Sequence, residues 1–316
     1  MHTPEKANNF MFGLLVFFVG GQLIFAMAIP LGIINLENFP IWLQVIVVQV
    51  GFIGIPCAAY LIAHRQNIRQ ILPLRPLGLM NTLMVIGMSI AIYPLTLLIG
   101  AIFGAIFGSP IGYMMTDFID ESGIWLMLLL VPVLPSIFEE VALRGIVFSG
   151  YKSVKIFTAA LINGLFFGIL HLNLHQFSYA FILGFIMCYM MWYTKSLWAP
   201  ILCHFVVNTL ATLLLYIGMG IDGEGLAAEV EYGVSGVDMT ATQEFLDGLI
   251  VVGGVALVFF GIFIVIYRAF KRHNLARNDA AGIATDTYAP AERGRVLTWS
   301  LVATVALGLV MMILAL

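Results

Sequence analysis

The chain has 316 residues, of which 61% are hydrophobic and 10% are charged, and its formal net charge at pH 7 is −3. Its mean hydropathy of +1.03 is too high for a water-soluble protein of this length to hide in one core, which excludes a soluble globular domain. The sequence has no basic patch with interleaved aromatic residues, so we expect no nucleic-acid partner.

Apolar runs long enough to cross about 30 Å of hydrocarbon recur along the whole chain, and they lack the residue alternation of a β-barrel. We therefore predict an all-α, polytopic integral membrane bundle with eight or nine transmembrane helices. The first span has no small-residue cleavage site after it, so we expect a retained anchor. The candidate spans are residues 10–34, 41–63, 79–107, 124–149, 157–173, 177–194, 197–219, 249–267 and 297–316.

Charged residues are sorted between alternate loops of this predicted bundle. Lys and Arg concentrate at residues 65–75, 152–155, 195 and 268–295, whereas the intervening loops carry Asp and Glu without Lys or Arg. Because basic loops stay on the cytoplasmic side, we expect a cytoplasmic N-terminus, and a plasma (inner) membrane location if the source is bacterial. The lipid bilayer is the expected partner, with the basic segment 268–277 on anionic headgroups.

Three cysteines lie inside the apolar spans, at Cys57, Cys188 and Cys203. Burial in a span favours structural thiols over a disulfide framework. The fourth apolar run also contains Pro132 and Pro135, each of which removes a helix hydrogen bond or begins a helix. We expect a kink or a restarted helix there. A restart would place Glu139 near a helix beginning, where backbone N–H groups favour a carboxylate.

The same run, from Ile124 to Phe148, contains Glu139, Glu140 and Arg144. Charged side chains at bilayer depth are costly, and they usually face a polar cavity that serves a function. On a helix Glu140 and Arg144 are i, i+4 neighbours and can pair, whereas Glu139 points about 100° away. We therefore predict that Glu140 is a neutralised structural partner and that Glu139 is the free carboxylate.

Two further pairs of residues are spaced four apart in apolar segments: Phe167 with His171, and His204 with Asn208. Imidazole and amide groups both donate hydrogen bonds, and a neutral histidine also accepts one or binds a metal. A single histidine in an apolar helix is typically a packing residue. Polar groups on three apolar segments between residues 139 and 208 are hard to bury unless they satisfy one another, so a purely structural polar network is the alternative to a catalytic site.

In this order the three groups resemble the signature motifs of the CPBP family, the CAAX proteases and bacteriocin-processing enzymes, which includes Rce1-type prenyl-protein proteases. The resemblance covers about residues 124–212 and implies an intramembrane endopeptidase with a hydrophilic cavity open toward the cytoplasm. The family also contains scaffold and immunity proteins, so a non-catalytic role is an alternative. The motifs are Glu139-Glu140-x-x-x-Arg144, Phe167-x-x-x-His171 and His204-x-x-x-Asn208.

The resemblance also implies roles for the six polar residues. Glu139 would activate water with the help of His171, His204 and Asn208 would stabilise the oxyanion, and Glu140 with Arg144 would support them. We accordingly divide the chain into N-terminal transmembrane helices at 1–123, catalytic core helices at 124–219, an acidic extracytoplasmic loop at 220–248, and C-terminal transmembrane helices with a basic cytoplasmic loop at 249–316.

Several mechanisms remain open at this point. A Zn²⁺ site of Glu139, His171 and His204 is possible, although the His-Glu-x-x-His motif is absent, and we favour water activation without a metal. A serine or cysteine nucleophile is disfavoured because Ser136 has no adjacent histidine and Cys203 lies at the wrong helical angle to His204. A transporter is a further alternative, because intramembrane carboxylates and histidines also build ion sites. Transporters often have repeated halves with interrupted helices, whereas the polar residues of this chain are confined to one third of it, which argues against that alternative.

The expected substrate is a membrane-proximal peptide or protein segment, with or without an attached lipid. Aromatic residues such as Phe166, Phe167, Phe177 and Trp198 would line an acyl pocket or simply pack in the core. The predicted boundaries carry one geometric difficulty. They put Glu139 and His204 in the cytoplasmic halves of their spans and His171 near the opposite end, so tilt or a restart at Pro135 is needed to bring them together.

Overall fold

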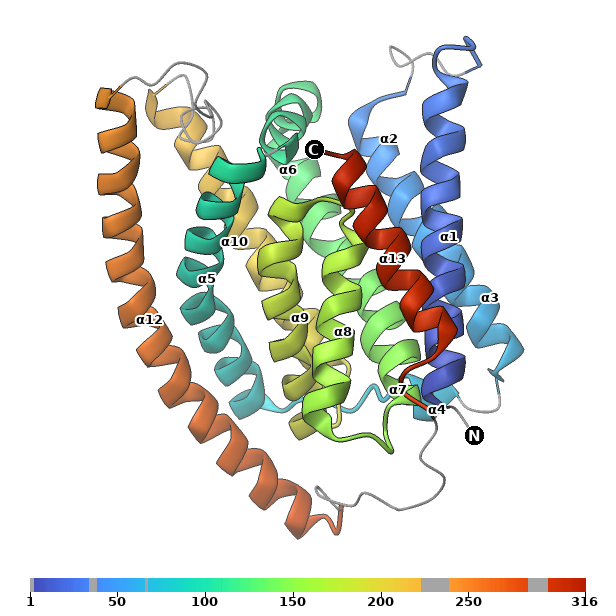
Figure 1. Cartoon of the computed structure of the whole chain (residues 1–316). Coiled ribbons are helices and arrows are strands. Elements are labelled where there is room, and N and C mark those ends of the chain that lie inside the picture. The colour runs from blue at the N-terminus through green and yellow to red at the C-terminus, as the bar shows by residue number, and fades with distance from the viewer. Residues whose placement is uncertain (1–2, 34–38, 66–67, 109, 223–238, 284–294) are drawn as a thin grey trace.

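The chain folds into a bundle of helices in the computed structural model, which describes residues 3–33, 39–65, 68–108, 110–222, 239–283 and 295–316 (Figure 1). Two of the segments, η2 and η4, are π-helical. The elements are α1 (Pro4–Ala28), α2 (Ile41–Ile46), η2 (Val47–Gly54), α3 (Ile55–Ala63), α4 (Ile68–Ile71), α5 (Leu79–Phe107), α6 (Pro110–Glu140), η4 (Val141–Val147), α7 (Phe148–Gly150), α8 (Ile156–Leu170), α9 (Leu174–Thr194), α10 (Trp198–Asp222), α12 (Met239–Ala280) and α13 (Trp299–Leu314).

Within the described residues, seven helical stretches are long and apolar enough to cross a membrane, and α8 and α13 are shorter apolar helices. The prediction of an all-α, multi-pass membrane bundle is confirmed. Each of the nine predicted spans overlaps one of these stretches in the described part of the chain. The predicted buried, unpaired thiols are also confirmed, because Cys57, Cys188 and Cys203 are all free and buried.

The helices that carry the polar motifs lie in the middle of the bundle. Figure 1 shows α12 at one edge and α1, α2 and α3 at the other, with α5, α6, α8, α9 and α10 between them. Helix α10 packs against both α5 and α6, α8 packs against α9, and α13 packs against α1 and α8. The motif residues are therefore shielded from lipid by neighbouring helices on both sides.

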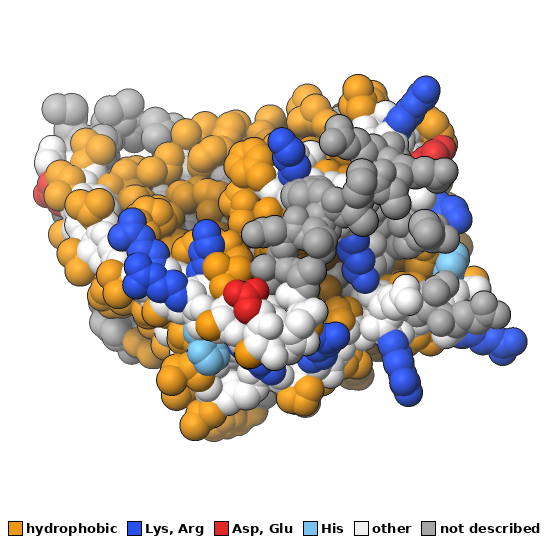
Figure 2. Space-filling view, turned by 90° about the horizontal axis from the view of Figure 1, so that it is seen from below, with side chains coloured by type: hydrophobic (Ala, Val, Ile, Leu, Met, Phe, Trp, Pro, Cys, Tyr) orange, Lys and Arg blue, Asp and Glu red, His pale blue; other side chains and the backbone are white. Residues whose placement is uncertain are grey.

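One face of the bundle is basic. Figure 2 views the molecule from below, and most of the charged side chains on this face are Lys and Arg. The N-terminal end, α4 and α7 lie at this lower face in Figure 1. The loops predicted to be basic therefore gather on one side. That this side is the cytoplasmic one stays a prediction.

Helix α6 differs from the sequence prediction. Pro132 and Pro135 lie inside the helix, which continues to Glu140, and the break in its backbone is at Gly123, where φ is 77°. The predicted restart at Pro135 is therefore wrong, and Glu139 does not lie near a helix beginning. Instead, the α-helical backbone changes to the π-helical segment η4 directly after Glu140. Such π-helical turns are frequent at functional sites.

Two segments predicted as loops are partly helical. Helix α10 extends to Asp222, and α12 runs from Met239 to Ala280, which includes the ends of the predicted loops 220–248 and 268–296. The basic end of α12 is helical because one face of it is buried at Phe270, Asn274 and Asn278, which are spaced four residues apart. The remainder of the predicted acidic loop, residues 223–238, and residues 284–294 lie outside the described residues.

Helix α8 is shorter than predicted, and its length resolves the difficulty with His171. Its 15 residues rise about 22 Å, less than the roughly 30 Å of a hydrocarbon core. The turn that joins it to α9 lies below the upper ends of α1, α6 and α12 in Figure 1. His171 follows α8 directly and therefore lies inside the bundle. The predicted full crossing at 157–173 is wrong in length.

Helices α8 and α9 can approach closely because glycines lie between them. An added Cβ at Gly164 would lie 2.7 Å from the Phe181 carbonyl oxygen, and one at Gly168 would lie 2.6 Å from the Phe177 ring. These two glycines form a Gly-x-x-x-Gly pair, a spacing that lets membrane helices pack backbone to backbone. The close contact fixes the position of the residues at the end of α8.

Candidate active site

A buried ion pair forms the centre of the polar cluster. Arg144 Nη1 lies 2.7 Å from Glu140 Oε1, and neither side chain has any exposed surface. His204 Nδ1 lies 3.0 Å from the same carboxylate oxygen, and His204 is 6% exposed. The pairing of Glu140 with Arg144 that the i, i+4 spacing predicted is thus present, and His204 joins it from α10.

The Phe167 ring holds this cluster together. The Arg144 guanidinium lies over the ring, with its central carbon 4.6 Å from the ring centroid, a cation–π arrangement. The His171 and His204 rings contact Phe167 edge to face, with centroids 5.1 Å and 5.4 Å away. One aromatic residue therefore brings together the arginine of η4 and the two histidines from α8 and α10.

Glycine on α9 makes room for the arginine. An added Cβ at Gly184 would lie 2.9 Å from Gly164 Cα and 3.1 Å from Arg144 Nη2. Any side chain at this position would push against the buried guanidinium or separate α8 from α9. The packing of α8 on α9 and the placement of Arg144 thus depend on the same glycine.

Glu139 has a different partner, which the sequence analysis missed. Gln49 Nε2, on η2, donates a hydrogen bond of 2.9 Å to Glu139 Oε1, and both residues are 8% exposed. The other oxygens of the two side chains, Glu139 Oε2 and Gln49 Oε1, are buried without a hydrogen-bond partner among the described residues. An available signal was the polar Gln49 itself, an amide inside the apolar run 41–63 that needs a buried partner.

His171 is oriented by the backbone. Its Nδ1 lies 2.8 Å from the Phe167 carbonyl oxygen, and because a carbonyl only accepts, Nδ1 carries the proton. The Nε2 atom is therefore the one left for chemistry. The end of the short helix α8 thus brings an imidazole into the polar cluster, where its ring contacts Phe167.

Asn208 is turned toward a different group. Its Nδ2 lies 3.4 Å from the Val131 carbonyl oxygen on α6. In an α-helix this carbonyl would bond the N–H of residue 135, which is a proline and has none. The amide predicted to stabilise an oxyanion therefore satisfies a backbone carbonyl in this structure.

The residues do not fit a metal site. Among the described residues, no group of three or more His, Cys, Asp or Glu side chains is arranged to hold a metal ion. This includes the Glu139, His171 and His204 set considered for Zn²⁺. We therefore derive no step that uses a metal.

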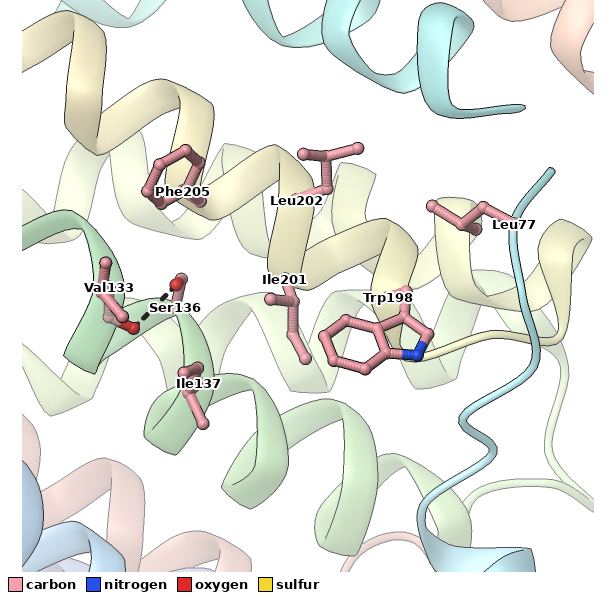
Figure 3. Close-up of a pocket in the computed structure, with 8 residues that line it drawn as sticks. All are labelled: Leu77, Val133, Ser136, Ile137, Trp198, Ile201, Leu202 and Phe205. Carbon is pink, nitrogen blue, oxygen red and sulfur yellow. Dashed lines mark hydrogen bonds between the residues drawn. The ribbon is translucent and has the colours of Figure 1, made fainter. Parts of the chain in front are cut away.

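An apolar groove of about 360 Å³ lies between α6 and α10, beside the polar cluster (Figure 3). The one hydroxyl in its wall, on Ser136, donates to the Val133 carbonyl at 2.9 Å, as the dashed line in Figure 3 shows. The groove is therefore apolar, unlike the hydrophilic cavity that the family resemblance implied. Its lining residues are Leu77, Val133, Ser136, Ile137, Trp198, Ile201, Leu202 and Phe205.

The groove reaches a different part of the site at each end. Glu140 lies four residues after Ser136 on α6, and Asn208 lies three residues after Phe205 on α10, so each continues the lining face of its helix. Because α6 and α10 run in opposite directions, with Asn208 bonded to Val131 and His204 bonded to Glu140, these two continuations lie at opposite ends of the groove. Of the aromatic residues proposed for an acyl pocket, Trp198 lines the groove, whereas Phe166 and Phe167 are buried in the core.

Residues 121–210 match the family model described as Type II CAAX prenyl endopeptidase Rce1-like. Over 90 residues the chain is 31% identical to the Bacillus subtilis (strain 168) protein named "Putative membrane peptidase YdiL". That match covers 28% of this chain and 37% of the relative. No solved structure matches the chain. The six polar residues predicted from the sequence all lie within the segment that matches the family model, whereas Gln49 lies outside it.

Proposed function

We propose that this chain, which carries an Rce1-like type II CAAX prenyl endopeptidase domain in residues 121–210, is an intramembrane endopeptidase. One observation carries the proposal. Arg144 and His204 both bind Oε1 of the Glu140 carboxylate, whereas among the described residues Glu139 is hydrogen-bonded only to the neutral amide of Gln49; one oxygen of each carboxylate, Oε2, has no partner there. Two adjacent carboxylates are thereby separated into a structural group and a group that is free to act as a base.

In this mechanism Glu139 Oε2 takes a proton from a water molecule, whose oxygen attacks the carbonyl carbon of the scissile peptide bond. His204 donates through Nδ1 to Glu140, so a second proton on Nε2 would let it stabilise the oxyanion. With His204 doubly protonated, the charges of Glu139, Glu140, Arg144 and His204 sum to zero. Such a balance suits a buried cluster.

His171 completes the proton transfers. Its Nε2 atom faces away from the hydrogen bond that Nδ1 makes with the Phe167 carbonyl, so it can accept the proton from Glu139 and pass it to the nitrogen of the leaving amine. The bond between carbonyl carbon and amide nitrogen then breaks, releasing a carboxylic acid and an amine, and Glu139 is again a carboxylate. Asn208 would join the oxyanion site only if its amide left the Val131 carbonyl, so we assign it first to positioning α10 on α6.

The apolar groove supports a substrate with a hydrophobic part. A lipid chain or an apolar segment lying between α6 and α10 would place the attached peptide toward Glu140, which continues the lining face of α6. We propose that such a lipidated or apolar membrane-proximal peptide is cleaved. We also place the basic face of Figure 2 at the cytoplasmic side of the membrane.

Covalent catalysis receives little support from the geometry. The Ser136 hydroxyl donates to a backbone carbonyl, and Cys203 is fully buried beside the site. A scaffold or transporter role would use the same polar residues without hydrolysis. The proposed function is separated from these alternatives by whether peptide cleavage occurs and by which side chains it requires.

The test is to incubate the purified protein with lipidated and unlipidated peptides and to compare wild type with Glu139→Ala, His171→Ala and His204→Ala. His273→Ala is the matched control, because His273 is exposed on α12. We expect cleavage by wild type and by the control, and loss in the three site variants with folding intact. Wild type without cleavage of any peptide, or Glu139→Ala with full activity, would contradict the proposal.

A further inference from the structure

We infer that Gln49 positions the attacking water, and that the active site is therefore completed by a helix outside the matched domain. The inference rests on the proposed hydrolysis and goes beyond it, because Gln49 belongs to the membrane-spanning stretch Ile41–Ala63 and not to residues 121–210. Two buried acceptor atoms, Gln49 Oε1 and Glu139 Oε2, lack a donor although their side chains are hydrogen-bonded to each other.

The position of Gln49 is fixed by close packing of η2 on α6. An added Cβ at Gly54 would lie 2.9 Å from the Phe138 ring, so only glycine permits this approach. Phe138 directly precedes Glu139, and the contact sets the distance at which η2 passes the carboxylate. The π-helical turn of η2 contains Gln49, which is buried and reaches Glu139 Oε1 at 2.9 Å.

A buried amide oxygen without a partner is costly. Among the described residues, no side chain donates to Gln49 Oε1: Arg144 Nη1 and His204 Nδ1 bind Glu140, His171 Nδ1 binds the Phe167 carbonyl, and Arg144 Nε and Nη2 are buried without any hydrogen-bond partner. A molecule in the site would supply the donor that Gln49 Oε1 lacks. Since Glu139 Oε2 needs a donor as well, a single species with two hydrogens would satisfy both atoms.

Water is such a species. One O–H donates to Glu139 Oε2 and the other to Gln49 Oε1, which leaves the lone pairs of the oxygen free to attack a carbonyl carbon. During attack the first proton moves to Glu139, while the neutral amide of Gln49 neither gains nor loses a proton. Gln49 thus has two functions: its N–H₂ group fixes the rotamer of the base, and its carbonyl oxygen orients the nucleophile.

The experiment compares steady-state cleavage of a peptide substrate by wild type, Gln49→Met and Gln44→Met. Methionine keeps the length of the side chain and packs well in apolar surroundings, so it preserves packing while removing both polar atoms. Gln44 is the control, because it lies on α2, directly before η2 in the same span. Within the described residues, its side-chain amide donates only to the Phe39 carbonyl.

We expect Gln49→Met to lower kcat by about ten-fold to a hundred-fold, because a fold-change of this size corresponds to the loss of a hydrogen bond to a charged group. KM and the melting temperature should stay close to those of wild type. Gln44→Met should leave kcat unchanged. A kcat for Gln49→Met equal to that of wild type would overturn the inference, as would a drop of the same size in the control. If Gln49→Met does not fold, Gln49→Asn, which keeps the amide but retracts it, must show the same loss of kcat.

Failure of this inference is distinguishable from failure of the proposed function. If the wild-type protein cleaves none of the peptides, the hydrolase assignment fails. If wild type cleaves and loses activity in Glu139→Gln but not in Gln49→Met, hydrolysis stands and the role of Gln49 is wrong. A rise in KM without a change in kcat would assign Gln49 to substrate binding and would also overturn the inference.

Discussion

Asn208 donates a hydrogen bond of 3.4 Å to the carbonyl of Val131, the backbone group that Pro135 leaves without its helical donor. A residue of the third sequence motif thus repairs a helix defect next to the first motif. The contact joins α10 to α6 at the end of the apolar groove. It also explains how Pro135 is tolerated inside a membrane-spanning helix, where every carbonyl needs a partner.

Asn208→Leu should destabilise the protein by about 1 kcal/mol, the usual net value of a hydrogen bond to a buried group. Alanine at position 135 would restore a backbone N–H for the Val131 carbonyl. The destabilisation should therefore shrink markedly when Asn208→Leu is combined with Pro135→Ala. Thermal unfolding of the four proteins in detergent gives this comparison. Equal losses in both backgrounds would show that Asn208 does not act through Val131.

Arg144→Met should be one of the most damaging single substitutions. It leaves the fully buried Glu140 with only His204 as a partner, and removal of one member of a buried ion pair typically costs about 3–5 kcal/mol. Replacing Glu140 as well, in Glu140→Leu with Arg144→Met, should recover part of that loss. The same unfolding assay measures both, with Arg69→Met as an exposed control. A double variant less stable than Arg144→Met would contradict the prediction.

Gly184→Ala should destabilise the bundle by about 1–3 kcal/mol, because the added methyl group would overlap Gly164 and crowd the Arg144 guanidinium. Gly261→Ala is the matched control, since a Cβ at Gly261 meets nothing within 4 Å and alanine favours a helix. The readout is the melting temperature of each variant. Tolerance of Gly184→Ala at the level of Gly261→Ala would argue against the tight α8–α9 contact.

Ile201→Trp should fill the groove between α6 and α10 and weaken the binding of a lipidated peptide. We expect KM to rise about ten-fold with kcat little changed, since overfilling an apolar pocket costs on the order of 1–3 kcal/mol. Ile250→Trp, at an exposed position of α12, is the control. A lipidated peptide whose KM is the same for both variants would place its apolar part elsewhere.

The sequence was informative where one physical rule dominates. Apolar length predicts the approximate spans, and helical spacing correctly predicts the pairing of Glu140 with Arg144. The roles proposed for Glu139, His171, His204 and Asn208 stay predictions. The structure adds that His171 is oriented by a carbonyl and that Asn208 is engaged on α6.

Other features depend on contacts between distant segments, which spacing does not reveal. Gln49 is 90 residues from Glu139, whereas helical spacing relates only residues three or four apart. The short α8 follows from its packing on α9 through Gly164 and Gly168, and the helical end of α12 follows from burial of Phe270 and Asn274. Pattern reading assigned these boundaries wrongly because tertiary contacts determine them.

The most direct test of the account is the rate at which Glu139→Gln cleaves a peptide that the wild type cleaves. Glutamine keeps the size of the side chain and its hydrogen bonding to Gln49, but it cannot accept the proton of water. The account predicts that kcat falls by about a hundred-fold or more while the melting temperature is unchanged. Cleavage by Glu139→Gln at the wild-type rate would contradict it.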